Sequence, residues 1–197
     1  MTKVQRKRFF FGIVLFFMIS GIIVTTYNEM VTRDEMIKNA YAQIETNMQR
    51  ELDLLPNLIK VVQKYAQYEE RVLKDITALR ADASKHLKAQ TPTEQKEIKE
   101  LSKIDKALKS STTQLFMVAE NYPQLKASEN FLELQSQIEG AQNRINIARM
   151  RYNDAVRDFN AYIRTFPANI MAKMAGYGKQ EYFHADEKAH QAFKVEM

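Results

Sequence analysis

The feature that most restricts this chain is an uncharged apolar stretch near its N-terminus. The 18 residues from Phe9 to Thr26 include no acidic or basic side chain. As a helix they would extend about 27 Å, close to the hydrocarbon thickness of a bilayer. The sequence therefore predicts a transmembrane anchor at 9–26 behind a basic flank at 1–8. The basic residues of this membrane flank are Lys3, Arg6, Lys7 and Arg8.

The charges on either side of the anchor predict its orientation. Basic residues dominate before it, whereas acidic and basic residues are mixed after it. By the positive-inside rule the N-terminus stays in the cytoplasm and the remainder lies outside. A cleaved signal peptide is the alternative, but no small-x-small cleavage site follows the apolar stretch. We expect a single-pass protein with an extracytoplasmic body.

The formal net charge of +5 does not indicate a nucleic-acid partner. Of the 29 Lys and Arg residues four lie in the flank, which leaves 25 basic against 24 acidic residues in the rest of the chain. A nucleic-acid module concentrates basic side chains on the face that meets phosphate. The body is nearly neutral, so we expect membrane lipid, and no nucleic acid, among its partners.

A scarcity of chain breakers predicts an all-α fold. The 197 residues include only five Gly and four Pro. Apolar residues recur in steps of three and four through 27–166, the spacing of a helical seam. We predict an antiparallel, up-down bundle of four long helices over 27–166. A short helix from Ala168 to Ala175 and an irregular tail complete the region 167–197.

Pro56 marks the first predicted break in this helical pattern. A proline is tolerated in a first turn, and Asp53 could cap that turn, so the first helix would end near Arg50 and a second would begin. The second helix would then be longer than the first and would return to the membrane surface. Its far end includes Lys85 and Lys88, and two interpretations stay open: these residues contact anionic lipid, or the helix bends and the turn is solvated.

Two further signals place the remaining helices. A capping box with proline at the first helical position, at residues 91–94, opens the third helix. Tyr122 and Pro123 end it, and a fourth helix runs from Phe131 to Phe166 with an unbroken apolar seam. Its descending end would deliver an amphipathic segment, Phe166 to Tyr177, toward the membrane surface.

The fourth helix also repeats asparagine, a residue of low helix propensity. The interpretation stays open between a solvated face and amides that hydrogen-bond across helices or between subunits. The repeated residues are Asn143, Asn146, Asn153 and Asn160.

No pattern in the sequence specifies a reaction. Glu69 stands alone on an apolar seam, where we expect it to pair with Arg33 or Arg80 and fix helix register. Glu-x-x-His occurs at Glu181 and at Glu187, but a di-iron site takes one such pair from each of two facing helices. The chain also lacks cysteine and a Gly-rich phosphate loop. We expect an exposed tail, no metal, no cofactor, no catalytic residue and no enzymatic activity.

A set of residues spread over nearly the whole chain resembles the bacterial LemA family in order and spacing. The resemblance implies an N-terminally anchored helical bundle of the bacterial inner (cytoplasmic) membrane, without an established activity and with members associated with magnetosome membranes. The sequence departs from the family pattern at residues 49–51 and 141–142. The residues that carry the resemblance are Tyr27, Asn28, Arg33, Asp53, Pro56, Asn57, Glu69, Tyr122, Pro123, Asn143, Arg144, Arg149, Tyr152, Asn153, Asn160 and Pro167.

These observations favour a membrane-anchored scaffolding protein. We expect a homo-oligomer whose periplasmic bundle self-assembles and organises or remodels the bilayer. The alternative is a monomeric, membrane-tethered adaptor for a partner enzyme or sensor.

Overall fold

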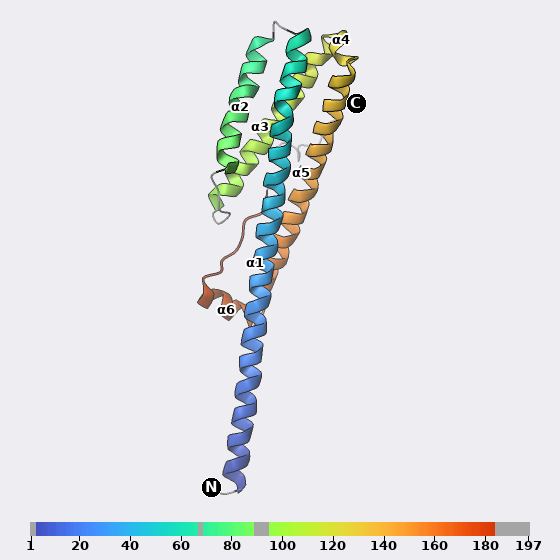
Figure 1. Cartoon of the computed structure of the whole chain (residues 1–197). Coiled ribbons are helices and arrows are strands. Elements are labelled where there is room, and N and C mark those ends of the chain that lie inside the picture. The colour runs from blue at the N-terminus through green and yellow to red at the C-terminus, as the bar shows by residue number, and fades with distance from the viewer. Residues whose placement is uncertain (1–2, 67–68, 89–94, 184–197) are drawn as a thin grey trace, which may run out of the picture. The chain divides into compact units, whose positions relative to one another are not determined.

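The structure is a computed structural model that describes residues 3–66, 69–88 and 95–183. All regular secondary structure within these ranges is helical, which confirms the all-α fold class (Figure 1). The helices are α1 (Lys3–Tyr65), α2 (Glu70–Lys88), α3 (Gln95–Glu120), α4 (Pro123–Lys126), α5 (Glu129–Tyr162) and α6 (Ala168–Ala175).

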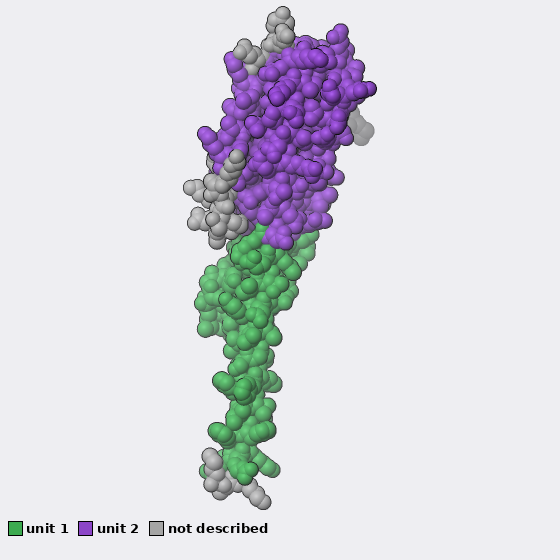
Figure 2. Space-filling view, in the orientation of Figure 1, with its two compact units in different colours: residues 1–38, 154–180 green, residues 39–153, 181–197 purple. Residues whose placement is uncertain are grey.

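The chain divides into two compact units, shown in different colours in Figure 2. Unit 1 comprises Met1–Lys38 and Asp154–Gln180, and unit 2 comprises Asn39–Asn153 and Glu181–Met197. Each unit therefore takes one part of α1 and one part of α5.

The N-terminal part of α1 is long and apolar enough to cross a membrane. Only 6% of its most apolar window is buried within the structure. A core helix of a soluble protein with this composition would be mostly buried, because burial of apolar surface is what stabilises it. Instead, large side chains such as Phe9, Phe16 and Val24 are more than half exposed.

The predicted helix break at Pro56 is wrong. Helix α1 continues through Pro56 to Tyr65, a length of 63 residues. An interior proline costs a helix about 3 kcal/mol. Leu52, Leu55 and Leu58 around it are fully buried, and each contributes roughly 1.5–3 kcal/mol. A break at Pro56 would interrupt this stripe, so packing outweighs the local effect of the proline.

In unit 2 the chain reverses between α1 and α2, and α2 runs back along α1. The Arg80 Nε–H donates to the Leu52 carbonyl oxygen at 3.3 Å. Helix α1 continues beyond Arg50 to Tyr65, and α2 is a helix of only 19 residues, so the second helix is not the longer of the two. The length argument for lipid contact by Lys85 and Lys88 therefore does not hold. Lys85 is exposed on α2, and the Lys88 side chain lies outside the described residues.

The core of unit 2 joins α1, α3 and α5. The Tyr41 and Tyr152 rings lie edge to face with centroids 6.4 Å apart, and Phe116 meets Phe131 at 6.1 Å. The predicted seams of the third and fourth helices are largely buried, but the fourth helix, α5, ends at Tyr162 and not at Phe166, and Phe166 is 80% exposed. Their buried members include Ile98, Leu101, Leu108, Leu115, Ile138, Ala141, Ile145 and Ala148. The capping box at 91–94 lies outside the described residues.

In unit 1 the end of α5 packs against α1 where the apolar stretch ends. The Tyr162 hydroxyl donates to the Thr26 carbonyl oxygen at 3.1 Å. The Arg33 guanidinium carbon lies 4.8 Å from the Tyr162 ring centroid, and Met30 and Phe159 are fully buried.

Helix α6 spans the residues for which the sequence predicts a short helix. Gly176 ends it with a left-handed φ of 77°, which glycine adopts without a steric penalty, and its N–H reaches the Ala172 carbonyl. Ala168 and Ala172 form the buried face of α6.

Candidate functional site

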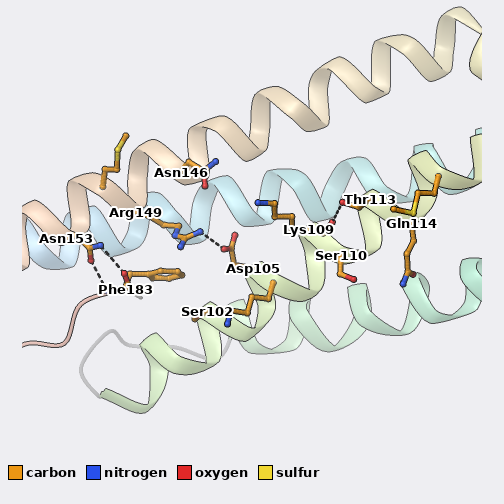
Figure 3. Close-up of a pocket in the computed structure, with 13 residues that line it drawn as sticks. Ser102, Asp105, Lys109, Ser110, Thr113, Gln114, Asn146, Arg149, Asn153 and Phe183 are labelled. Carbon is orange, nitrogen blue, oxygen red and sulfur yellow. Dashed lines mark hydrogen bonds and ion pairs between the residues drawn. The ribbon is translucent and has the colours of Figure 1, made fainter. Parts of the chain in front are cut away.

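Unit 2 carries a groove of about 850 Å³ between α3 and α5 (Figure 3). Polar and basic side chains line it, together with two methionines and one aromatic ring from the C-terminal segment. The lining residues are Ser102, Asp105, Lys106, Lys109, Ser110, Thr113, Gln114, Met117, Asn146, Arg149, Met150, Asn153 and Phe183.

An ion pair links the two walls of the groove. Arg149 Nη1 lies 2.8 Å from Asp105 Oδ2, and both side chains are largely buried. The Arg149 guanidinium carbon also lies 4.5 Å from the centroid of the Phe183 ring, a favourable cation–π distance. Burial raises the pKa of the Asp105 carboxyl, and the nearby Arg149, Lys109 and Lys106 cations oppose that rise.

The lining of the groove combines basic groups with exposed apolar side chains. Its charged residues are three cations and the single carboxylate of Asp105, which gives the groove a net positive charge. Met117 and Met150 are 63% and 60% exposed and offer adaptable apolar contact. The lining residues include hydroxyl groups, but none is a histidine or cysteine that could form a nucleophile–base pair. An acidic ligand with some apolar surface would match this groove.

A buried polar network in the same unit joins α1, α3 and α5. Glu51 is 1% exposed. Gln142 Nε2 donates to Glu51 Oε1 at 3.1 Å and to Thr112 Oγ1 at 2.8 Å. Burial raises the pKa of Glu51 to about 7, the negative charge of Asp105 adds to the rise, and the Gln142 hydrogen bond opposes it.

Sequence reasoning missed this network, although a signal for it existed. Glu51 and Gln142 lie at the two places where the chain departs from the LemA pattern, residues 49–51 and 141–142. The structure shows that these departures contact each other. Removal of either hydrogen-bonding partner alone would leave the other buried polar group unsatisfied.

In unit 2, the side-chain amide of Asn153 holds the backbone of the C-terminal segment. Asn153 Nδ2 donates to the Phe183 carbonyl at 3.0 Å, and its Oδ1 accepts from the Phe183 N–H at 2.8 Å. The Tyr152 hydroxyl donates to the Glu181 carbonyl at 3.0 Å. Phe183 is only 2% exposed, so the prediction of an exposed tail is wrong as far as this residue.

In unit 1, Asn160 makes the same two-bond contact with another residue of that segment. Its Nδ2 donates to the Gln180 carbonyl at 2.9 Å, and its Oδ1 accepts from the Gln180 N–H at 2.8 Å. Two of the repeated asparagines thus bind the backbone of their own chain, whereas Asn143 and Asn146 are exposed. The histidines of the two Glu-x-x-His pairs, and Glu187, lie outside the described residues.

Glu69 does not have the partner that the sequence predicts. It lies in the turn between α1 and α2, and its Oε1 accepts from the Tyr122 hydroxyl at 3.5 Å. Arg80 instead binds the Leu52 carbonyl, and Arg33 pairs with Glu29 at 2.7 Å. An ion pair of Glu69 with Arg33 or Arg80 therefore does not fix the register of the helices.

The remaining residues of the predicted set are dispersed along the helices. Asp53 accepts from Gln49 Nε2 at 2.8 Å within α1 and caps no helix. Pro123 is the first residue of α4, and Pro167 precedes α6. Tyr27, Asn28, Asn57 and Arg144 are exposed. Of the predicted set, only Arg149 and Asn153 line the groove.

Comparison with protein families decides the identity of this helical body. The LemA family model matches residues 40–197, which include the whole groove and the Glu51 network. The chain belongs to the LemA family. The match begins beyond the apolar stretch, at residue 40, so the LemA region corresponds to the helical body that follows this stretch. A comparison with curated proteins finds no match.

The raised pKa of Glu51 predicts pH-dependent stability. Between about pH 4.5 and pH 7 the folded protein holds a proton that the unfolded chain releases, so stability falls as pH rises through this window. Glu51→Gln removes the buried charge. We expect it to raise the free energy of unfolding by about 2–3 kcal/mol at pH 8, and by little at pH 5.

Thermal unfolding of the full chain in detergent, followed by circular dichroism at both pH values, measures this difference. The exposed Glu139→Gln provides the matched control and should change stability equally little at pH 5 and pH 8. An equal gain for Glu51→Gln at both pH values would show that this carboxyl does not titrate as described.

Proposed function

We propose that this LemA protein is a membrane-anchored scaffold whose helical body self-associates and organises or remodels the bilayer. The observation that carries the proposal is the apolar window of α1, which is 6% buried although the same helix continues into a packed body. A helix of this kind holds the body close to the membrane without a flexible linker.

We further propose that unit 2 is an up-down four-helix bundle made by α1, α2, α3 and α5. Contacts between three pairs of antiparallel helices support it. Arg80 joins α2 to α1, Tyr41 meets Tyr152 between α1 and α5, and Arg149 pairs with Asp105 between α5 and α3. A rigid bundle of this kind suits a structural role, because its surface is fixed before a partner binds.

Self-association follows from anchoring by mass action. Anchors confine the bodies to a plane and raise their effective concentration, so that weak lateral contacts become sufficient. We expect the full chain, chemically cross-linked in the membrane before extraction in mild detergent, to run as one large homogeneous particle in size-exclusion chromatography with light scattering. A monomer at every protein concentration would contradict the scaffold.

The groove favours a second function, that of an adaptor for a partner enzyme or sensor. In that case the extracted chain is monomeric and gains mass only when the partner is added. Lys106→Glu with Lys109→Glu reverses the charge of the groove and would abolish that gain. The same double substitution would leave the particle size of a self-assembled scaffold unchanged.

We also propose that the N-terminus lies in the cytoplasm and the body in the periplasm, at the inner membrane of a bacterium. The support is the basic flank Lys3, Arg6, Lys7 and Arg8 before the apolar window. Protease added to intact spheroplasts should digest the body. Complete protection of the body until the cells are lysed would reverse the orientation.

A further inference from the structure

Unit 1 carries an apolar stripe that its described part leaves exposed. Phe166, Ile170 and Met174 are 80%, 51% and 78% exposed. Steps of four residues place Ile170 and Met174 on the same face of α6, and Phe166 extends that face from the preceding turn. The opposite face of α6, with Ala168 and Ala172, is buried. The helix is therefore amphipathic, with its small side chains inward and its large apolar ones outward.

The contacts of unit 1 place this stripe beside the end of the apolar window of α1. Tyr162, the last residue of α5, donates its hydroxyl hydrogen bond to the carbonyl of Thr26. The chain turns immediately afterwards, and α6 lies across α1 instead of along it (Figure 1). Tyr177 then packs against Phe159, with ring centroids 5.9 Å apart. Helix α6 thus begins near the level at which the anchor would leave the hydrocarbon.

The segment that contains α6 carries charges of one sign only. Residues 163–180 include Arg164, Lys173 and Lys179 and no aspartate or glutamate. All three basic residues are exposed. Basic side chains beside large apolar ones are the composition of helices that lie in the interface of an anionic membrane.

We propose that α6 is a second membrane contact, an interfacial helix that rests in the surface of the bilayer beside the anchor. Phe166, Ile170 and Met174 enter the boundary between headgroups and acyl chains. Arg164, Lys173 and Lys179 meet anionic headgroups. The proposal rests on membrane anchoring by α1. It adds a second point of membrane contact, which limits the tilt and rotation of unit 1 on the membrane.

The absence of cysteine allows a direct test with single nitroxide labels in the full chain. Ile170→Cys and Met174→Cys place labels on the exposed stripe. Ala175→Cys is the matched control, because residue 175 is also exposed but lies about 140° around the helix from Ile170. Phe16→Cys reports the anchor, and Asn146→Cys reports exposed solvent in unit 2.

Each labelled protein is reconstituted into nanodiscs of phosphatidylethanolamine and phosphatidylglycerol. Its collision rates with oxygen and with a water-soluble nickel chelate are then measured. We expect the ratio of the oxygen collision rate to the nickel-chelate collision rate to be severalfold higher for labels at 170 and 174 than for labels at 175 and 146. This ratio should fall at 170 and 174 when a neutral lipid replaces phosphatidylglycerol in the nanodiscs. It should also fall when Lys173→Gln and Lys179→Gln are combined.

The controls separate failure of this inference from failure of the proposed anchoring. Water-like labels at 170 and 174 beside a lipid-like label at 16 would overturn the interfacial helix and leave the anchor intact. A water-like label at 16 would overturn both. Labels at 170 and 174 shielded from both reagents would show that protein, such as a second copy of the chain, covers the stripe instead of lipid.

Discussion

The continuous apolar stripe of α1 is the constraint on which the rest of the structure depends. Along one helix the apolar residues change from an exposed window to a buried seam, and the helix does not break between them. Pro56 lies inside the buried part, where the surrounding leucines hold it in helix. The chain therefore first reverses beyond Tyr65, between α1 and α2, and this reversal sets the register of α2 against α1.

Polar contacts fix how the other helices of unit 2 meet α1. Gln142 holds both Glu51 and Thr112, while Arg149 lies between Asp105 and the Phe183 ring. Buried polar groups of this kind specify one packing, because any other register would leave them without partners. Asp105 and Arg149 also bring charge to the groove. Its binding chemistry and the register of the helices therefore depend on a shared set of side chains.

Features set by local composition or by regular spacing could be predicted from the sequence. The apolar window, the all-helical fold and the buried seams of α3 and α5 belong to this group, because each depends on many residues that agree. The break at Pro56 was predicted from local propensity alone, and long-range burial overrides it. The asparagine contacts of Asn153 and Asn160 could not be found from periodicity, since their partners are backbone groups with no sequence signature. Glu51 is intermediate between these two groups. The residue stands out in the sequence, but its hydrogen-bond partner Gln142 is 91 positions away and could not be identified.

Helix α1 is uninterrupted through Pro56, and a distance measured across that residue tests this continuity most directly. Ala42 and Lys60 are exposed on α1 and lie 18 residues, or five turns, apart. Spin labels on Ala42→Cys with Lys60→Cys can be measured by double electron–electron resonance in the full chain. A continuous helix predicts a narrow distribution near about 27 Å between the labelled backbone positions. A chain that reversed at Pro56 would bring them to about 15 Å, and such a distance would contradict the account.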